Sequence, residues 1–346
     1  MLRAIEKIES RSFFNARKRG LAFVVFALFF GLLPSAALAD GISGYRAHYA
    51  VCVSGRSGDE RLALRKFRKN GGDFLLLVEP ASLRTSIAPA SSIRCASDTA
   101  ENIRHRFSSS FYVRAIEDSR RNAGKLQNAG FTRLLPSGKG INLTVDLCPS
   151  TLPLDRVLFT RILEEFAAIE RPVPLGLSVT GLWMNDHEED IRWLVGLEGS
   201  GLIAITWINH SYNHRYNRRL PLKSNFLLEK GTDLDYEVLA TERKMIENGL
   251  TPSVFFRFPG LVSDRTLVNI ITGYGLLPLG SDAWLGKRQW PGSGSIVLVH
   301  ANGREPIGIV RFLELLRARK KEIVNGQWHL YDLRDSVVEH ERESAK

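Results

Sequence analysis

From residue 140 onward the sequence alternates between short apolar runs and longer amphipathic runs, and this alternation constrains the fold more than any other feature. The short runs are rich in β-branched and large apolar residues and predict strands at 141–147, 174–179, 202–208, 253–258, 275–279, 295–299 and 328–331. Helical spacing of apolar residues predicts helices at 154–169, 186–197, 233–247, 264–271 and 306–320. Strands and helices that alternate in this way form a parallel sheet. We therefore predict an α/β fold, a distorted (β/α) barrel of about seven parallel strands over residues 140–332.

Residues 40–139 lack this regularity and predict a small α+β region in front of the barrel. Apolar runs at 47–53 and 74–78 indicate strands, whereas the basic stretch 61–69 and the spacing over 111–129 are typical of helices. No segment here carries a pattern of catalytic residues, so the sequence assigns no role to the region. The last residues, 333–346, are charged and are predicted to form a frayed tail.

The first 39 residues have the order of a secretory signal. A basic flank at 17–19 precedes an uncharged apolar run at 21–33, and the small residues that follow predict cleavage after Ala39. An uncleaved membrane anchor is the alternative, because the uncharged segment 21–39 is just long enough to span a bilayer. Export is expected in both cases. After cleavage the protein would be periplasmic or secreted, with no membrane span.

The charge of the chain excludes one class of partner. Removal of residues 1–39 lowers 47 basic and 37 acidic residues to 41 and 35, so the net charge falls from +10 to +6. No dense basic helix with interleaved aromatic residues remains, so we do not expect nucleic acid as a partner. The remaining positive charge would suit an anionic polymer such as a cell wall.

Three cysteines remain after cleavage. In an exported protein Cys52 and Cys95 can form a disulfide, which would stabilise the N-terminal region by about 4 kcal/mol in the chain-entropy model. Two buried free thiols are the alternative, and the sequence leaves both open. Cys148 is left over.

Charged or titratable side chains stand at the ends of five predicted strands. In a parallel barrel the carboxyl ends of the strands meet at one face, where the active site forms. The residues are Asp146, His210 with His214, Arg257, Asp282 and His300. Solvated surface does not explain so many in succession, so we predict that they share a catalytic site.

The two histidines predict a metal. His210 and His214 are four residues apart just after a strand, and imidazole is the commonest ligand of zinc and similar divalent ions. The set suits metal-assisted hydrolysis of an amide or ester. We expect a metal-bound water to attack the carbonyl, with Asp146 as base and His300 as acid.

Two further residues would support this chemistry. Arg257 would pair with Asp146 and keep the carboxylate ionised. Asp282 would hold the second ring nitrogen of a histidine and fix its tautomer.

The order of these motifs resembles the polysaccharide deacetylases, carbohydrate esterase family 4, whose domain is also called the NodB-homology domain. The resemblance covers about residues 140–332, with the motifs in the right order and at ordinary spacing. The family motif Thr-Phe-Asp-Asp-Gly-Pro corresponds to residues 144–149, His-Ser/Thr-x-x-His to 210–214, Arg-x-Pro to 257–259, the Asp/Trp motif to Asp282 with Trp284, and Leu-x-His to 298–300.

The resemblance implies removal of N- or O-acetyl groups from sugar polymers with zinc or a similar ion. It also implies that Gly260 offers a backbone N–H to the oxyanion, a role that any residue except proline could fill. Tyr212 and Trp284 become candidates to stack on sugar rings, and burial in the core is the alternative for both.

One residue departs from the family pattern. Of the family's two aspartates, the first is the base and the second is a metal ligand; Asp146 takes the first place and Leu147 the second. Leucine cannot bind a metal, so the ion would be held by His210, His214 and water, or would borrow another ligand. Cys148 is adjacent and a thiolate is an excellent zinc ligand, but its side chain should point to the face opposite Leu147.

The sequence therefore predicts an exported, metal-dependent hydrolase that removes acetyl groups from a polysaccharide or oligosaccharide, with weakly bound zinc. A catalytically impaired relative that binds glycan without deacetylating it is the alternative that Leu147 leaves open. A related amidohydrolase of a small non-sugar amide is a third reading, which the export signal disfavours.

Overall fold

The barrel predicted from residue 140 onward is present as a curled sheet of parallel strands. In the computed structural model, which describes residues 41–53, 58–134 and 138–344, the strand order is β10-β9-β8-β7-β6-β12-β11. The bounds are β6 (Gly140–Leu147), β7 (Val173–Val179), β8 (Ile203–Asn209), β9 (Phe255–Phe256), β10 (Leu277–Pro278), β11 (Ala283–Trp284) and β12 (Ile296–His300). Each neighbouring pair is parallel, and β13 (His329–Leu330) pairs with the start of β6. The prediction of a distorted (β/α) barrel is confirmed.

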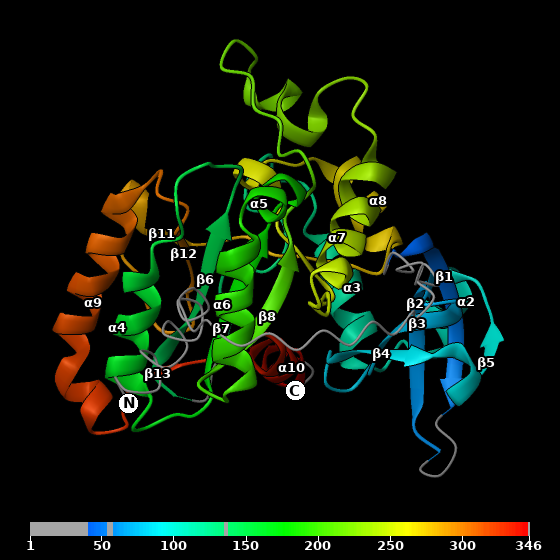
Figure 1. The fold of residues 1–346 in the computed structure, drawn as a ribbon, viewed down its shortest axis with the longest axis horizontal. Helices are drawn as coiled ribbons and strands as arrows, with labels where there is room; N and C mark the ends of the chain where they lie inside the picture. Colours follow the sequence, from blue (N-terminus) through cyan, green and yellow to red (C-terminus); the bar gives the residue numbers. More distant parts are fainter. Residues whose placement is uncertain (1–40, 54–57, 135–137, 345–346) are drawn as a thin grey trace, which may run out of the picture. The chain divides into compact units, whose positions relative to one another are not determined.

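Helices connect the strands and flank the sheet. Their bounds are α4 (Arg156–Phe166), α5 (Gly181–Asp186), α6 (Glu188–Gly199), a π-helical turn (Tyr236–Ala240) that runs into α7 (Thr241–Glu247), α8 (Arg265–Gly273) and α9 (Pro306–Val324). The side chains of Asp155 and Asp264 accept backbone N–H groups and so begin α4 and α8. In Figure 1, α4 and α9 lie side by side along one flank of the sheet.

Two predictions concern the first residues and the membrane. The signal predicted at 1–39 lies outside the described residues. Within the part of the chain that the structure describes, no helix is both long enough and apolar enough to cross a membrane.

Residues 131–134, which precede the barrel, complete its wall between β10 and β12. The N–H of Phe131 donates to the carbonyl of Pro278 in β10, and the N–H of Gly280 donates back to the carbonyl of Phe131. On the other side, the N–H of Ile296 in β12 donates to the carbonyl of Thr132. The region to which the sequence assigned no role therefore fills the gap in the barrel.

Gly130 permits this close approach. Its φ is +81°, and a Cβ at this position would lie 1.9 Å from the carbonyl oxygen of Pro278. Only glycine adopts this left-handed backbone without strain and also leaves room for the carbonyl of Pro278.

The N-terminal region forms an antiparallel sheet in the order β4-β3-β2-β1-β5. The strands are β1 (Ser43–Val53), β2 (Glu60–Lys69), β3 (Gly72–Val78), β4 (Thr85–Pro89) and β5 (Arg94–Ser97), and α2 (Ala100–Arg106) and α3 (Phe111–Arg121) follow. The prediction of a helix at 61–69 is wrong, because this stretch is β2. Leu62 and Leu64 pack toward the barrel, whereas Ala63 packs in a separate cluster with Cys52, so the run has the alternation of a strand.

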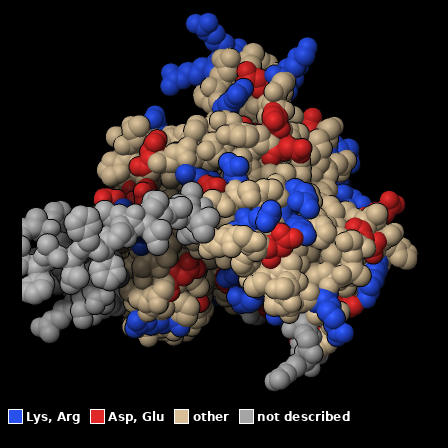
Figure 2. All heavy atoms as spheres, turned by 45° about the vertical axis from the view of Figure 1, so that its right-hand side comes forward, with Lys and Arg blue, Asp and Glu red and all other residues tan. Residues whose placement is uncertain are grey.

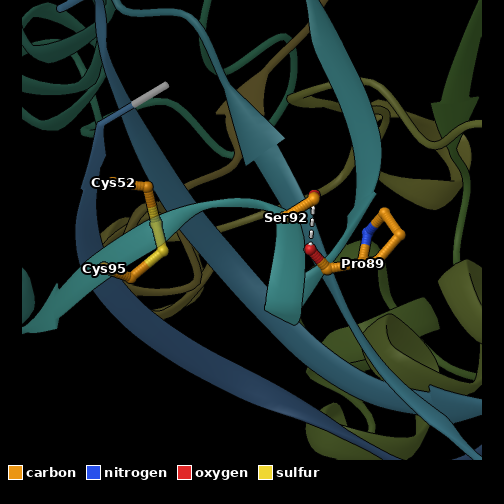
Figure 3. The surroundings of a disulfide bond; sticks show 4 residues. All are labelled: Cys52, Pro89, Ser92 and Cys95. Atoms are coloured by element: carbon orange, nitrogen blue, oxygen red, sulfur yellow. Dashed lines mark hydrogen bonds between the residues drawn. A yellow bond between two sulfur atoms is a disulfide. The ribbon is translucent and has the colours of Figure 1, made fainter. Parts of the chain in front are cut away.

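A disulfide links β1 to the edge strand β5. Cys52 and Cys95 lie opposite each other in the antiparallel pair and are bonded (Figure 3). The hydroxyl of Ser92, just before β5, donates to the carbonyl of Pro89 (Figure 3). Of the two alternatives that the sequence left open, the structure has the bridge. It closes a loop with a sequence separation of 43 residues, which corresponds to about 4 kcal/mol in the chain-entropy model.

The antiparallel sheet and the barrel share one hydrophobic core. A single buried cluster contains Leu62 of β2 and Phe255 of β9. The C-terminal residues, predicted to fray, form α10 (Leu333–Glu343), and its buried Leu333 and Val337 belong to the same cluster. Residues from Ile42 onward thus form one compact unit.

A buried ion pair also ties β2 to α7. The side chains of Arg65 and Glu242 are fully buried, with Arg65 Nε 2.6 Å from Glu242 Oε2 and Nη2 3.0 Å from Oε1. The hydroxyl of Tyr45 donates to the same carboxylate, and Arg65 Nη1 donates to the carbonyl of Tyr274. The pair is bidentate, so removing one partner would leave an uncompensated charge in the core.

We expect Glu242→Gln to lower the free energy of unfolding by roughly 3–5 kcal/mol, because Arg65 would keep its buried charge without a counter-charge. Urea unfolding followed by circular dichroism measures the loss. The control Glu164→Gln removes the exposed partner of Arg161 and should change the free energy by less than about 1 kcal/mol. Equally small changes in both variants would show that the buried pair does not hold β2 to α7.

Glu170, after α4, carries a perturbed carboxyl group. Burial raises the pKa of Glu170 to about 7, although a backbone hydrogen bond from Leu330 lowers it. Its Oε2 is buried without a hydrogen-bond partner among the described residues. The native state therefore binds this proton more tightly than the unfolded chain does. The stability that the proton contributes is present at low pH and is lost as the pH rises through about 7.

We expect Glu170→Gln to gain stability relative to the wild type between about pH 5 and pH 8, because the variant lacks this titration. The gain should be about 1 kcal/mol, since the side chain is partly exposed and solvent screens it. Urea unfolding of both proteins across this window gives the difference. A difference that does not change with pH would contradict the raised pKa.

Candidate active site at the carboxyl ends of the strands

The parallel register brings the predicted side chains to one face of the barrel. Asp146 on β6 is paired with Ser178 of β7 on one side and with His300 of β12 on the other. His210 follows β8 directly, and its N–H donates to the carbonyl of Val179 at the end of β7. The ends of β6, β8 and β12 thus meet at one point.

Three side chains converge at this point: Cys148, His210 and His214. Cys148 Sγ lies 3.5 Å from Nε2 of His210 and 3.5 Å from Nε2 of His214. His210 Nδ1 donates to the carbonyl of Arg257 over 2.8 Å, which leaves Nε2 as the atom that faces the thiol.

The donor set fits a divalent metal. One sulfur and two nitrogen atoms all lie within 4.8 Å of one another. A sulfur and a nitrogen ligand of a tetrahedral zinc ion, at about 2.3 and 2.1 Å from the metal, lie about 3.6 Å apart, close to the 3.5 Å between Cys148 Sγ and each Nε2. Three protein ligands and one open position are the usual arrangement of a catalytic zinc site.

The expectation that Leu147 faces the site while Cys148 points away from it is wrong, because the two side chains lie on opposite faces in the reverse sense. Leu147 is fully buried and does not line the cavity. Cys148 lines the cavity. Of the ligands that the site could borrow, the structure therefore offers the thiol.

The charges around the thiol favour its ionised form. Burial favours the neutral thiol, but the three surrounding imidazoles outweigh burial and hold the pKa of Cys148 well below its ordinary value. Burial also favours a neutral His214, but the neighbouring Cys148 raises the pKa of His214. The thiolate is the form that binds a metal.

Asp146 lies beside this cluster with its hydrogen-bond capacity largely unused. Arg257 Nη1 lies 3.8 Å from Asp146 Oδ1, and both side chains are buried, so the predicted pair is present but loose. Arg257 Nη2 donates to the hydroxyl of Thr144. Within the described part of the chain, Asp146 Oδ1 has no hydrogen-bond partner. A buried carboxylate with a free lone pair at a cavity suits a bound water or ligand.

His300 has a carboxylate partner, but it is Glu305. His300 Nδ1 lies 2.9 Å from Glu305 Oε2, which also accepts a hydrogen bond from the indole N–H of Trp284. Burial favours a neutral His300, but Cys148 and Glu305 favour the protonated ring more strongly and raise the pKa of His300 to about 10.

Asp282 lies apart from the histidines. Its Oδ2 is 2.7 Å from Nε of Arg133, in the segment that completes the barrel wall, and it accepts a hydrogen bond from the hydroxyl of Ser295. The position that the sequence gave to Asp282, on the ring nitrogen of a histidine, is held by Glu305.

A cavity of about 590 Å³ lies at this face of the barrel, and its lining includes Asp146, Cys148, His210, His214 and His300. Trp284 is part of its wall, and so are Tyr216 and Phe226, whose rings stack with centroids 5.1 Å apart. Tyr212 is not among the lining residues, because its ring packs against Tyr236. Tyr216 is thus the tyrosine at the cavity.

Glu237 fixes the loop that carries the second histidine. Its buried carboxylate accepts the backbone N–H groups of Tyr212 and Asn213 and the side-chain N–H of Asn213, over 2.7–2.9 Å. His214 adopts φ +47°, a left-handed backbone that costs energy in a residue other than glycine. These hydrogen bonds offset that cost and aim His214 at Cys148.

Gly260, the candidate oxyanion donor, lines the cavity. Its φ is +61°, and a Cβ there would lie 2.4 Å from Cζ of Phe226. The expectation that any residue except proline could stand here is therefore too broad, because the turn and the Phe226 ring require glycine.

Sequence reasoning missed Glu305, Glu237 and Tyr216. Glu305 lies in the loop before α9 and Glu237 lies within the predicted helix 233–247, and neither belongs to a motif. An acidic residue five positions after a strand-end histidine was the single available signal, and it pointed to Glu305.

Solved structures similar to this chain are family 4 carbohydrate esterases, whereas no family model matches the sequence. A family 4 carbohydrate esterase from Bacillus anthracis shares 18% identity over 64% of this chain and 90% of its own, with a TM-score of 0.44. The family 4 carbohydrate esterase PdaA from Bacillus subtilis shares 14% identity over 63% of this chain and 94% of its own, with a TM-score of 0.44. A pseudoenzyme of the same family from Bacillus anthracis shares 15% identity over 60% of this chain and 68% of its own, with a TM-score of 0.41. At these identities the likeness concerns the fold, and the chemistry has to be argued from the residues above.

We expect Gly260→Ala to lower the free energy of unfolding by roughly 2–4 kcal/mol, because it adds a clash with Phe226 to the strain of a left-handed alanine. The control Gly249→Ala has the same kind of backbone, with φ +76°, but its added Cβ would meet nothing within 4 Å. It should lose only about 1 kcal/mol. The difference between the two variants in urea unfolding gives the contribution of the clash to the free energy of unfolding. Equal losses of stability in both variants would show that the Phe226 ring moves aside freely.

Proposed function

We propose that this chain is a metal-dependent hydrolase of the polysaccharide deacetylase type, carbohydrate esterase family 4, that removes acetyl groups from a glycan. One observation carries the proposal: Cys148, His210 and His214 present three metal-ligating atoms to one point, with Asp146 and His300 in the same cavity. A protein that only binds glycan needs neither a ligand set nor a flanking base and acid.

Cys148, His210 and His214 would hold the ion, and zinc is the expected one because thiolate and imidazole both suit it. When bound, such an ion polarises an acyl carbonyl and lowers the pKa of water.

The proton transfers belong to the flanking residues. Asp146 is the base: it lines the cavity, its Oδ2 lies 3.8 Å from Nε2 of His210, and its Oδ1 has no hydrogen-bond partner among the described residues. His300 is the acid, because Glu305 holds its Nδ1 and favours the protonated ring beside the departing nitrogen or oxygen. The backbone N–H of Gly260 is the candidate donor to the oxyanion.

The aromatic side chains in the cavity wall and the cellular compartment of the protein both favour one kind of substrate. Trp284 and Tyr216 offer ring faces at the cavity, which suit the apolar faces of sugars. The Cys52–Cys95 disulfide agrees with an oxidising compartment, as the predicted signal does. An acetylated polysaccharide or oligosaccharide outside the cytoplasm meets both conditions.

The second candidate is a catalytically impaired relative that binds glycan without deacetylating it. The buried Leu147 favours it, because the ligand set then contains a thiolate in place of a carboxylate. Acetate release from acetylated xylan, chitin oligosaccharides and peptidoglycan, with and without a chelator, separates the two. Release that the chelator stops and added zinc restores supports the hydrolase, whereas binding without release supports the second candidate.

We expect zinc to protect Cys148 from alkylation by iodoacetamide at least roughly tenfold, because a metal-bound thiolate is a poor nucleophile. Cys148 is the one free thiol, since the other two cysteines are bonded to each other. Cys148→Ser should weaken zinc binding by roughly a hundredfold or more in competition with a chromophoric chelator. Unchanged alkylation at saturating zinc would remove the thiol from the ligand set.

We expect Asp146→Asn and His300→Gln each to slow acetate release by roughly 10²–10⁴-fold, the usual contribution of a general base or acid. Zinc content should stay that of the wild type, because neither residue is assigned as a ligand. Elemental analysis of the purified variants provides this check. Loss of zinc from Asp146→Asn would mean that Asp146 is a ligand and that the base lies elsewhere.

A further inference from the structure

Unpaired cations stand at the mouth of the cavity. Arg215, directly after His214, and Arg304, on the loop between β12 and α9, both line the cavity and are exposed. Neither forms an ion pair with any residue of the described chain. The one acidic side chain that lines the cavity is Asp146, and it is buried. The entrance therefore carries uncompensated positive charge.

The segment 215–230, which we term the basic arm, extends this charge beyond the strand ends. It lies between β8 and the π-helical turn and projects from the barrel in Figure 1. Figure 2 shows basic side chains gathered on it. Besides Arg215, the arm carries Arg218, Arg219, Lys223 and Lys230, all exposed, against the single acidic residue Glu229.

The basic arm has a defined shape. The buried side chain of Asn225 donates to the carbonyls of Asn217 and Leu220 and accepts the N–H of Asn217. Tyr216 stacks on Phe226 from across the arm. These contacts fix the shape of the arm, whose first residue, Arg215, lines the cavity.

We propose, on the basis of the proposed function, that the substrate is an anionic acylated glycan. Its carboxylate or phosphate groups bind Arg215 and Arg304, and the adjoining part of the glycan chain follows the basic arm. Guanidinium groups bind carboxylate and phosphate through paired, charge-assisted hydrogen bonds. A cluster of like charges around one opening also attracts a polyanion over a distance of about a Debye length. Two of these cations, Arg215 and Arg304, lie in the cavity wall itself. Their charge would therefore act on the substrate in the cavity and not only attract the protein to an anionic surface.

The test measures binding and not turnover. Calorimetry with the purified protein compares tetragalacturonate, which carries carboxylates, an oligomer of glycerol phosphate, which carries phosphates, and neutral cellotetraose. We expect at least one of the two anions to bind at least roughly tenfold more tightly than cellotetraose at low salt, with the advantage falling as salt screens the charges. The anion that binds more tightly shows whether the acidic group of the substrate is a carboxylate or a phosphate. Equal binding of all three probes would overturn the inference.

Matched variants locate the binding. Arg215→Gln and Arg304→Gln should each weaken binding of the preferred anion by roughly three- to tenfold while leaving cellotetraose unchanged. The control Arg317→Gln removes an exposed charge from α9, outside the lining of the cavity, and should have no effect. An anion preference that survives the double variant of Arg215 and Arg304 would overturn the assignment.

Two further outcomes are distinguishable. Anion binding without acetate release from any glycan would refute the proposed function and leave anion recognition standing. Binding to phosphatidylglycerol vesicles that Arg218→Gln with Arg219→Gln abolishes, with no preference among the oligosaccharides, would overturn the inference in favour of a membrane surface.

Discussion

The in-register parallel pairing of β6 with β12 is the constraint on which the site depends. It sets Asp146 opposite His300, and a slip of one residue would turn either side chain to the other face of the sheet. Asp146 on β6 and Cys148, the first residue after the strand, line the cavity, whereas Leu147 between them is buried. Cys148 is therefore the side chain that this strand end presents to the two histidines.

The barrel that carries these strand ends also contains residues from a region without chemistry of its own. The segment 131–134 completes the wall between β10 and β12, and Gly130 lets its backbone approach Pro278. The buried pair of Arg65 and Glu242 and a shared core cluster hold the antiparallel sheet against the barrel. The N-terminal region is therefore part of the scaffold that keeps the strand ends in place.

Much of the barrel could be predicted because its strands are continuous apolar runs, as buried parallel strands are. The strand β2 could not be predicted, because its many basic residues are typical of an exposed segment, although residues 62–65 are buried on both faces of the sheet. The helix α10 was not predicted for a similar reason. Most of its residues are charged or polar, so the buried positions Leu333 and Val337 do not stand out in the sequence. At the site, strand-end motifs identified Asp146, His210, His214 and His300. Glu305 and Glu237 act through loop and helix positions that no motif marks, so only the folded chain brings them to the histidines.

The thiol in the ligand set is the central claim, and X-ray absorption at the zinc edge tests it most directly. The zinc-loaded protein should show one sulfur at about 2.3 Å together with nitrogen or oxygen ligands at about 2.0–2.1 Å. The sulfur shell should vanish in Cys148→Ser. A first shell made of nitrogen and oxygen alone in the unsubstituted protein would contradict the account, because Cys148 would then lie beside the metal site without belonging to it.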